Sequence, residues 1–471
     1  MEIVKDLGVG RCMDVAAVRD RLYVIGSGKL HVLDITQSHS PELLGTLTNL
    51  GHTRQIEVQN DVAYITARED GVFIVDVSNS AKPRLLSHYN AIELATGIAI
   101  SGKVAFVACR TYGVELVDVS DPGKPLHLST IRTGEAQSCV ARDGILYVGV
   151  WGSKELVICD AKNPRAPQII SKTPLDGYGD GLCVRGSHCF VATGHHSRSM
   201  RKRDESDPGF GNGHGLEIFD ITQPEEPAFV SRIKAPRYYR IGMDMWDVAV
   251  SGNYAYLADT YNGAFVVDIS DIERPSFVGH RQLAHVKSRK ASSPVAGFAI
   301  GKGVVYAAGA WTDLHVIDAP MAEPAKSEPD TPPVIPPFTP AQNDRFHVYK
   351  PDGQVWAVAF ANDVALVACG SAGLHAVQLW PSISKLAEYP TEGFAVDVKV
   401  QGDHVYVAES KGGLSIWKRE QDGTLAAAGR FRVRGQSIKQ VVVPPRGNYA
   451  LLDVGQSSFY IIDVTDPATP K

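Results

Sequence analysis

Short apolar runs separated by turn residues recur along the whole chain. One stretch illustrates the pattern: the runs "WDVAV", "YAYLAD", "GAFVVDIS" and "PSFVGH" follow one another between Trp246 and His280. Runs of this length that are rich in β-branched and aromatic residues, and bounded by Gly, Asn, Asp or Pro, predict β-strands. Four strands in each unit of about 42 residues predict an all-β repeat protein.

A phrase within this unit returns nearly unchanged. "GVFIVDVSNSAKP" begins at Gly71, and similar phrases begin at Gly113, Gly215 and Gly263. The first strand of each unit is expected near Asp14, Gln55, Gly97, Ser138, Gly181, Asp247, Gly297, Ala357, Asp397 and Gln440. Four-stranded units at this spacing favour a single β-propeller domain over residues 1–471, with ten blades.

The two ends of the chain suggest how the ring closes. The tenth unit stops at "DVTDPATPK", after its third strand, whereas residues 2–9 resemble the fourth strands of other units. We expect residues 2–9 to complete the last blade, because this pairing would protect the sheet edges. Two five-bladed rings are the main alternative.

The phrase "VDVSDPxxP" places Asp76, Asp118, Asp268 and Asp463 at equivalent positions. In this phrase the chain resembles the LVIVD-repeat family of β-propellers. The resemblance implies the fold and says little about activity. We expect the repeated Asp to bind backbone groups of the turn that follows it, so the repeat is scaffold and function must lie where the units differ.

The units differ in a few long connections. Residues 195–214 form an insertion on the face where the connections between blades and the loops between second and third strands meet, which favours a lid or binding loop. Residues 234–245 and 283–294 reach the same face. Residues 321–346 are rich in proline and predict an extended loop on the opposite face. That loop could dock a partner or mediate homo-oligomerisation.

The residues expected around the mouth of the first face are polar and aromatic. The candidates for substrate binding are His52, Arg54, Arg68, Arg110, Tyr112, Gln137, Trp151, Trp246, Tyr261, Trp311 and Trp356. Aromatic rings stack on the apolar face of a sugar, and arginines bind carboxylates or neighbouring hydroxyls. The candidate catalytic residues are Asp180, Glu69, Asp259 and His195, with Glu409 as a further carboxylate. A pair of such carboxylates predicts a glycoside hydrolase acting on a small sugar or a uronate-containing glycoside.

Two other functions remain open. The first alternative is a non-catalytic binding scaffold for a protein partner, in which each carboxylate pairs with a neighbouring arginine. The second is a metal-dependent lyase or isomerase using His52, His195, His196 and His214. The chain has no HExxH motif and no paired-cysteine spacing, so we assign no metal and no cofactor.

Charge and composition narrow the choice of partner and compartment. The net charge is −5, which argues against nucleic acid and anionic membranes as partners. No apolar run reaches the ~20 residues of a membrane helix, and the N-terminus does not read as a signal peptide. The seven cysteines lie in or beside apolar runs and are expected to be free thiols. We expect a cytoplasmic protein, although a leader removed earlier would leave the same sequence.

Overall fold

The computed structural model describes residues 1–194, 214–234, 244–260, 262–324, 328–337, 348–380, 382–433, 435–444, 447–454 and 459–471. The described chain is built almost entirely of antiparallel sheets. It divides into two compact units. The first comprises Met1–His88, Leu94–Gly123 and Thr130–Ile335, and the second comprises Tyr89–Glu93, Lys124–Ser129 and Pro336–Lys471. No helix in these residues is long and apolar enough to cross a membrane.

Seven four-stranded sheets belong to the first unit, apart from Tyr89 at the end of β9 and residues 126–129 of β13, which are grouped with the second. The first three are β2 (Asp14–Val18), β3 (Arg21–Gly26), β4 (Lys29–Asp34), β5 (Glu42–Thr48); β6 (Gln55–Gln59), β7 (Val62–Thr66), β8 (Val72–Asp76), β9 (Arg84–Tyr89); and β10 (Gly97–Ser101), β11 (Val104–Ala108), β12 (Val114–Asp118), β13 (Leu126–Ile131). The next two are β14 (Ala136–Arg142), β15 (Ile145–Val150), β16 (Glu155–Asp160), β17 (Gln168–Pro174); and β18 (Tyr178–Arg185), β19 (His188–Gly194), β20 (Gly215–Asp220), β21 (Ala228–Lys234).

The sixth sheet is β22 (Met245–Ser251), β23 (Tyr254–Asp259), β24 (Gly263–Asp268) and β25 (Ser276–Arg281). The seventh joins β28 (Val295–Gly301), β29 (Val304–Gly309) and β30 (Leu314–Asp318) to β1 (Ile3–Asp6). Between these two sheets lie a short hairpin, β26 (His285–Val286) with β27 (Ala291–Ser292), and the 3-10 turn η2 (Lys287–Arg289).

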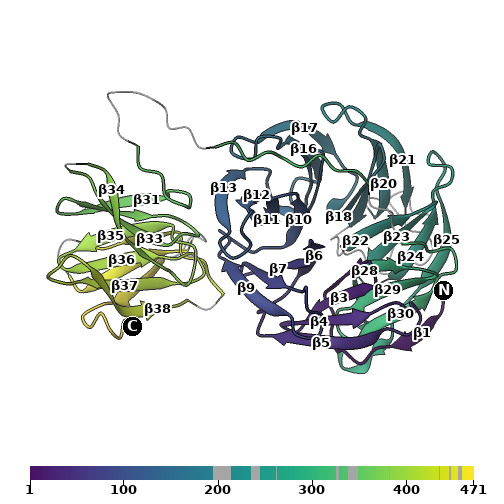
Figure 1. Cartoon of the computed structure of the whole chain (residues 1–471), viewed down its shortest axis with the longest axis horizontal. Coiled ribbons are helices and arrows are strands. Elements are labelled where there is room, and N and C mark those ends of the chain that lie inside the picture. The colour runs from purple at the N-terminus through teal and green to yellow at the C-terminus, as the bar shows by residue number, and fades with distance from the viewer. Residues whose placement is uncertain are drawn as a thin grey trace. The chain divides into compact units, whose positions relative to one another are not determined.

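The seven sheets succeed one another around a ring. Each first strand packs against the first strand of the next sheet, and β28 packs back against β2. In Figure 1 the inner strands β6, β10, β18, β22 and β28 face the centre of this ring. The apolar core lies between neighbouring sheets. Val15 of the first sheet, for example, packs with Leu314 and Val316 of the seventh.

The N-terminal strand corrects the predicted closure. β1 pairs antiparallel with β30, and the contact is extended by the bond from Leu7 N to Leu314 O. His315 Nδ1 also lies 2.6 Å from Asp6 Oδ1. Residues 2–9 therefore complete the seventh sheet and not the last one. The earlier prediction was wrong because many sheet edges can accept a strand of this pattern, and only long-range packing selects among them.

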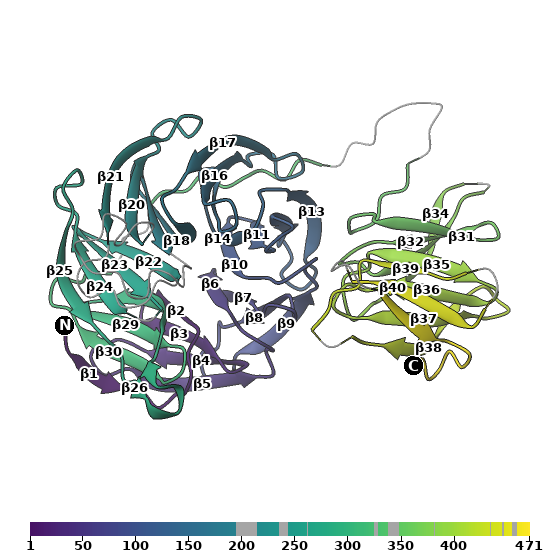
Figure 2. The same cartoon turned by 180° about the vertical axis from the view of Figure 1, so that it is seen from behind.

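The second unit contains three sheets in sequence. They are β31 (Ala357–Ala361), β32 (Val364–Ala368), β33 (Leu374–Gln378), β34 (Ser384–Tyr389); β35 (Asp397–Gln401), β36 (His404–Ala408), β37 (Leu414–Arg419), β38 (Leu425–Phe431); and β39 (Gln440–Val442), β40 (Tyr449–Asp453), β41 (Phe459–Asp463). In Figure 2, β39 and β40 lie beside β35 and β36, and β39 packs on both of them. All ten predicted first strands are thus present, but seven and three of them belong to separate units.

The repeated aspartate after each third strand has the expected structural role. Asp76 Oδ1 accepts hydrogen bonds from Ser78 N at 3.0 Å and from Ser78 Oγ at 2.6 Å. These bonds lower the pKa of Asp76, and the same arrangement recurs at Asp268 and Asp463. The carboxylate therefore fixes the turn that leads into the fourth strand.

The proline-rich segment follows the turns between first and second strands. Glu323 O accepts a hydrogen bond from Ser251 Oγ in the sixth sheet, and Glu328 pairs with Arg142 and Arg185. Further along, Asp330 accepts bonds from Ser101 Oγ at 2.7 Å and from Asp143 N at 2.7 Å. The described part of the segment thus crosses the sixth, fifth, fourth and third sheets at the turns that the sequence assigned to the face opposite the candidate mouth.

Candidate functional site

A cavity of about 250 Å³ lies at one end of the first unit. Its walls come from the starts of first strands and from the loops between second and third strands, in the second to sixth sheets. The lining residues are Arg54, Arg68, Leu94, Thr96, Arg110, Glu135, Gln137, Trp151, Asp180, Asp244 and Trp246. Seven of the predicted site residues meet here: Arg54, Arg68, Arg110, Gln137, Trp151, Asp180 and Trp246.

Backbone pairing between neighbouring sheets places two of the arginines. Arg68, with a positive φ of 49°, pairs through its backbone with Ala95, the residue that leads into the next sheet. Arg110, with φ of 38°, pairs in the same way with Ala136. The loop of one sheet is thus attached to the entry of the next, and each guanidinium lines the cavity at the junction between two sheets.

Asp180 is the most perturbed acid of the cavity. It is only 5% exposed, and its Oδ2 atom has no hydrogen-bond partner. Burial raises the pKa of Asp180 well above its usual value, and the nearby carboxylates of Asp244 and Glu135 raise it further. Arg54 acts in the opposite direction. The surroundings of Asp180 therefore favour its protonated form more than those of an exposed aspartate do.

Arg54 lies at the inner end of the cavity. Its guanidinium carbon is 4.7 Å from the centre of the Trp246 ring. Desolvation and the neighbouring Arg68 lower the pKa of Arg54, whereas Asp14, Asp180 and Asp244 raise it. The arrangement presents a cation next to an aromatic face.

The outer wall holds a second acid and a second aromatic group. Arg110 Nε donates to Glu135 Oε1 at 2.9 Å, and Gln137 Nε2 approaches the same oxygen at 3.5 Å. Trp151 Nε1 donates to Asp244 Oδ1 at 3.0 Å. These bonds hold two carboxylates and an indole in fixed positions.

A larger channel of about 800 Å³ runs along the first strands and shares Trp246 with the cavity. Two of its acids, Asp14 and Asp247, accept hydrogen bonds from backbone amides. Asp14 Oδ2 accepts from Ile56 N at 2.9 Å, and Asp247 Oδ2 accepts from Phe298 N at 2.9 Å, each bond joining two neighbouring sheets. Burial raises the pKa of Asp14 to about 8 and that of Asp247 to about 6.

Several predicted site residues do not line the cavity. His52 Nδ1 lies 2.8 Å from Glu69 Oε1, and both side chains are exposed. Asp259 is fully buried, with its Oδ2 atom 2.6 Å from His214 Nε2 and 3.0 Å from Asn262 Nδ2. It connects strand ends inside the fold and is closed to solvent.

The remaining aromatic candidates are also placed elsewhere. The Tyr112 ring lies under Arg132 and the Trp311 ring under Arg289. Trp356 belongs to the second unit and packs edge-on against Phe394. The candidates His195, His196 and Tyr261, and most of the inserted loop 195–214, lie outside the described residues.

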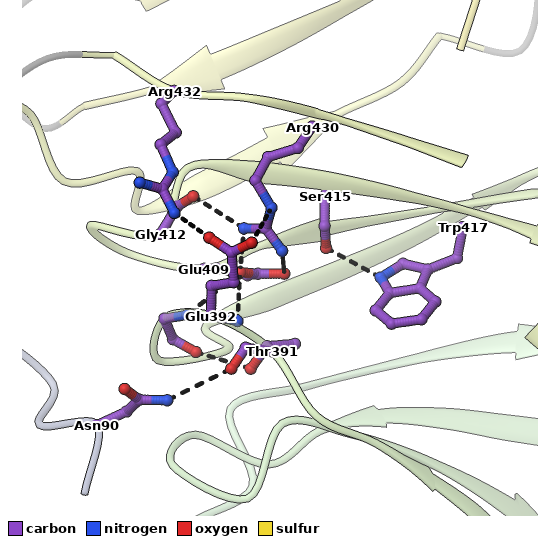
Figure 3. Close-up of polar contacts among 10 residues, drawn as sticks. Asn90, Thr391, Glu392, Glu409, Gly412, Ser415, Trp417, Arg430 and Arg432 are labelled. Atoms are coloured by element: carbon purple, nitrogen blue, oxygen red, sulfur yellow. Dashed lines mark hydrogen bonds and ion pairs between the residues drawn. The ribbon is translucent and has the colours of Figure 1, made fainter. Parts of the chain in front are cut away.

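Glu409 in the second unit is a structural acid. It is fully buried, and Arg430 donates to it from Nη1 at 2.5 Å and from Nη2 at 3.1 Å (Figure 3). The amide nitrogens of Glu392 and Gly393 donate to the same carboxylate. With these bonds formed, Glu409 has little capacity left for a ligand.

The sequence reasoning missed Glu135 and Asp244. Both precede first strands by a residue or two, as Arg54 precedes β6, so this shared position was an available signal. As for metals, no group of three or more His, Cys, Asp or Glu side chains in the described part of the chain is arranged to hold an ion.

Nine of the described sheets have four antiparallel strands, the last has three, and β26 and β27 form a short hairpin; this arrangement defines a repeat protein of the β-propeller type. The family model of the LVIVD repeat matches residues 50–91, 94–133, 133–172, 242–281, 392–416 and 440–471. The chain thus carries LVIVD repeats in both units, and the resemblance noted in its sequence is confirmed.

Other comparisons add little. No curated protein matches the chain. Among solved structures, the designed protein Ika8 is 10% identical, with 89% of this chain and 100% of that chain covered and a TM-score of 0.40. A chain of the mitotic checkpoint complex is 11% identical, with 67% and 88% covered and a TM-score of 0.49. Both similarities are too low to inform on function.

Proposed function

We propose that the first unit is a seven-bladed propeller that hydrolyses a small glycoside bearing a carboxylate, such as a uronide. The observation behind this proposal is the buried carboxyl of Asp180, whose pKa is raised, in a cavity that also contains Arg54, Arg110 and two tryptophans. Asp14 and Asp247 also have raised pKa values, but both accept hydrogen bonds from backbone amides of a neighbouring sheet, whereas the Oδ2 atom of Asp180 has no such partner.

The side chains divide into three roles. Trp246 and Trp151 stack on the sugar, and Arg54 or Arg110 binds its carboxylate. Asp180 donates its proton to the glycosidic oxygen as the bond to the sugar carbon breaks. A water molecule adds to that carbon, and Glu135, the acid held by Arg110, accepts its proton.

Hydrolysis of chromogenic hexuronides and of the matching neutral hexosides tests this proposal. We expect kcat/KM to favour the uronide, and Arg54→Gln or Arg110→Gln, whichever removes the arginine that binds the carboxylate, to reduce that preference. Asp180→Asn should lower kcat by about 10²–10⁴-fold, the usual contribution of a general acid. It should also remove the fall in activity at alkaline pH, because only the protonated carboxyl donates.

Glu69→Gln is the matched control, because Glu69 was an equally plausible acid in the sequence but lies outside the cavity. It should leave kcat unchanged. Binding of a hexuronic acid by calorimetry without turnover of any glycoside would show a binding module instead. Absence of both binding and turnover would overturn the proposal.

A further inference from the structure

The first and last sheets of the second unit, β31–β34 and β39–β41, have exposed apolar residues at positions that in other sheets contact a neighbouring sheet. Strand register makes Val358 of β31 equivalent to one residue in each of the other nine first strands: Val15, Ile56, Ile98, Cys139, Leu182, Val248, Phe298, Val398 and Val441. None of these nine is more than 8% exposed, whereas Val358 is 48% exposed. Phe360, on the same face, is 62% exposed.

The last sheet is exposed at the third-strand positions that, in other sheets, contact the first strand of the next sheet. Phe459 and Ile461 of β41 are 63% and 65% exposed. In the other nine sheets the equivalent pairs are at most 4% exposed: Leu30 and Val32, Val72 and Ile74, Val114 and Leu116, Leu156 and Ile158, Leu216 and Ile218, Ala264 and Val266, Leu314 and Val316, Leu374 and Ala376, Leu414 and Ile416.

These two sets of positions contact each other wherever two sheets adjoin. Leu374 and Ala376 pack on Val398 of the following sheet, and Leu414 and Ile416 pack on Val441. The last sheet therefore exposes one half of the repeated contact and the first sheet exposes the other half. An exposed apolar face of this kind marks an interaction surface.

The missing strands also match. Tyr349 packs on Val377 and Ile383 of the first sheet, as Tyr389, the last residue of β34, packs on Trp417 and Leu425 of the second. Tyr349 thus lies where the fourth strand of a preceding sheet would end, and the described residues of the second unit contain no strand of such a sheet. The last sheet consists of three described strands, β39, β40 and β41.

We propose that two copies of this chain associate through their second units, with the last sheet of each copy packed on the first sheet of the other. Propellers close with about four to eight blades. The three described sheets of one second unit are too few for a ring, and three copies would bring together nine. Two copies give a closed six-sheet ring with two-fold symmetry.

The area of contact is sufficient for a specific dimer. A face of three strands, about 4.8 Å apart and with five residues of about 3.3 Å each, covers about 250 Å². The two contacts bury four such faces, about 1,000 Å² in total, which reaches the size of specific interfaces.

Sedimentation and light scattering on the full chain test the proposal. We expect a species of twice the 50.9 kDa chain mass that dissociates on dilution. Val358→Asp and Ile461→Asp should each give a monomer, since either substitution places a charge in both contacts of the ring. Leu43→Asp is the matched control, because Leu43 is 55% exposed on the outer strand β5, and it should remain a dimer.

Mixing the two variants distinguishes the ring from other dimers. A Val358→Asp chain retains an intact last sheet and an Ile461→Asp chain retains an intact first sheet, so the mixture should regain one contact and form a heterodimer. A dimer of Ile461→Asp alone would indicate contact between two first sheets and overturn the ring. A monomeric wild-type chain at tens of micromolar, or oligomers that keep growing with concentration, would overturn it as well.

Discussion

The two units are built from the same repeat but end differently. In the first unit, β28 packs on β2, so Val15 is buried between the first and seventh sheets. In the second unit the equivalent residue, Val358, remains largely in solvent. The repeat therefore specifies a sheet and the way it contacts the next one. Closure depends on the number of sheets and on a strand such as β1.

The units also differ in how their acids are used. Glu409 of the second unit is satisfied by Arg430 and two backbone amides. Asp180 of the first unit is 5% exposed; its carboxyl interacts with that of Asp244, and its Oδ2 atom has no hydrogen-bond partner. The same repeat can thus bury one carboxylate with all its hydrogen bonds formed and another with an oxygen left unbonded.

Removal of β1 should cause the largest change, because it should make the sheets of the first unit end in an open edge. A chain that begins after Asp6 loses the pairing with β30 and leaves that strand as an open edge in the ring. We expect the first unit to lose about 5 kcal/mol of unfolding free energy or to fail to fold, which exceeds the effect of most point substitutions. Urea unfolding measures the loss.

A synthetic peptide with the sequence of residues 1–9 provides the control for this truncation. Added in excess, it should restore part of the lost stability, because it can bind the open edge of β30. The urea concentration at which the second unit unfolds should not change. An unchanged first transition in the truncated chain would show that β1 contributes nothing to closure.

The second prediction concerns pH. Burial raises the pKa of Asp14 to about 8, so the folded protein binds this proton more tightly than the unfolded chain does. Unfolding then releases a proton between about pH 4 and pH 8, and stability falls as the pH rises through this window. Asp14→Asn should remove its share of this decline, up to about 5 kcal/mol over the window. It should also lower stability by about 1 kcal/mol at every pH, because the single amide oxygen of Asn can accept only one of the two backbone bonds.

Asp397 of the second unit is the matched control for Asp14. It occupies the equivalent position and bonds to Val441 N at 3.1 Å, but Lys399 Nζ lies 2.6 Å from its Oδ1 atom. The ion pair offsets the cost of burying the carboxylate. Asp397→Asn should leave the pH trend of the first unit as it is. A wild-type protein whose stability rises from pH 5 to pH 8 would contradict the assignment.

Strand positions could be predicted from sequence because they depend on local pattern. Each of the ten first strands begins within about three residues of the expected position, since alternation and turn residues are local signals. The closure could not be predicted in this way. Residues 2–9 resemble any fourth strand, and contacts such as that of Asp6 with His315 join residues far apart in the chain.

The candidate site was predictable to the extent that its residues follow the repeat. Arg54, Arg68 and Arg110 line the cavity because their positions in the unit place them at the mouth. Asp259 occupies a similar loop position, but His214, from the previous sheet, binds it and closes it off. Such a partner across sheets has no signal in the local sequence.

The smallest expected effect compares one position in the two units. Val15→Ala removes two buried methyl groups between the first and seventh sheets and should cost about 2 kcal/mol. Val358→Ala, measured at a concentration low enough to keep the chain monomeric, should cost less than about 0.5 kcal/mol, as exposed substitutions do. Above the concentration at which the chain dimerises, the loss of unfolding free energy caused by Val358→Ala should increase, and the loss caused by Val15→Ala should not. Equal costs for both substitutions in the dilute protein would mean that another part of the chain already covers the first sheet of the second unit.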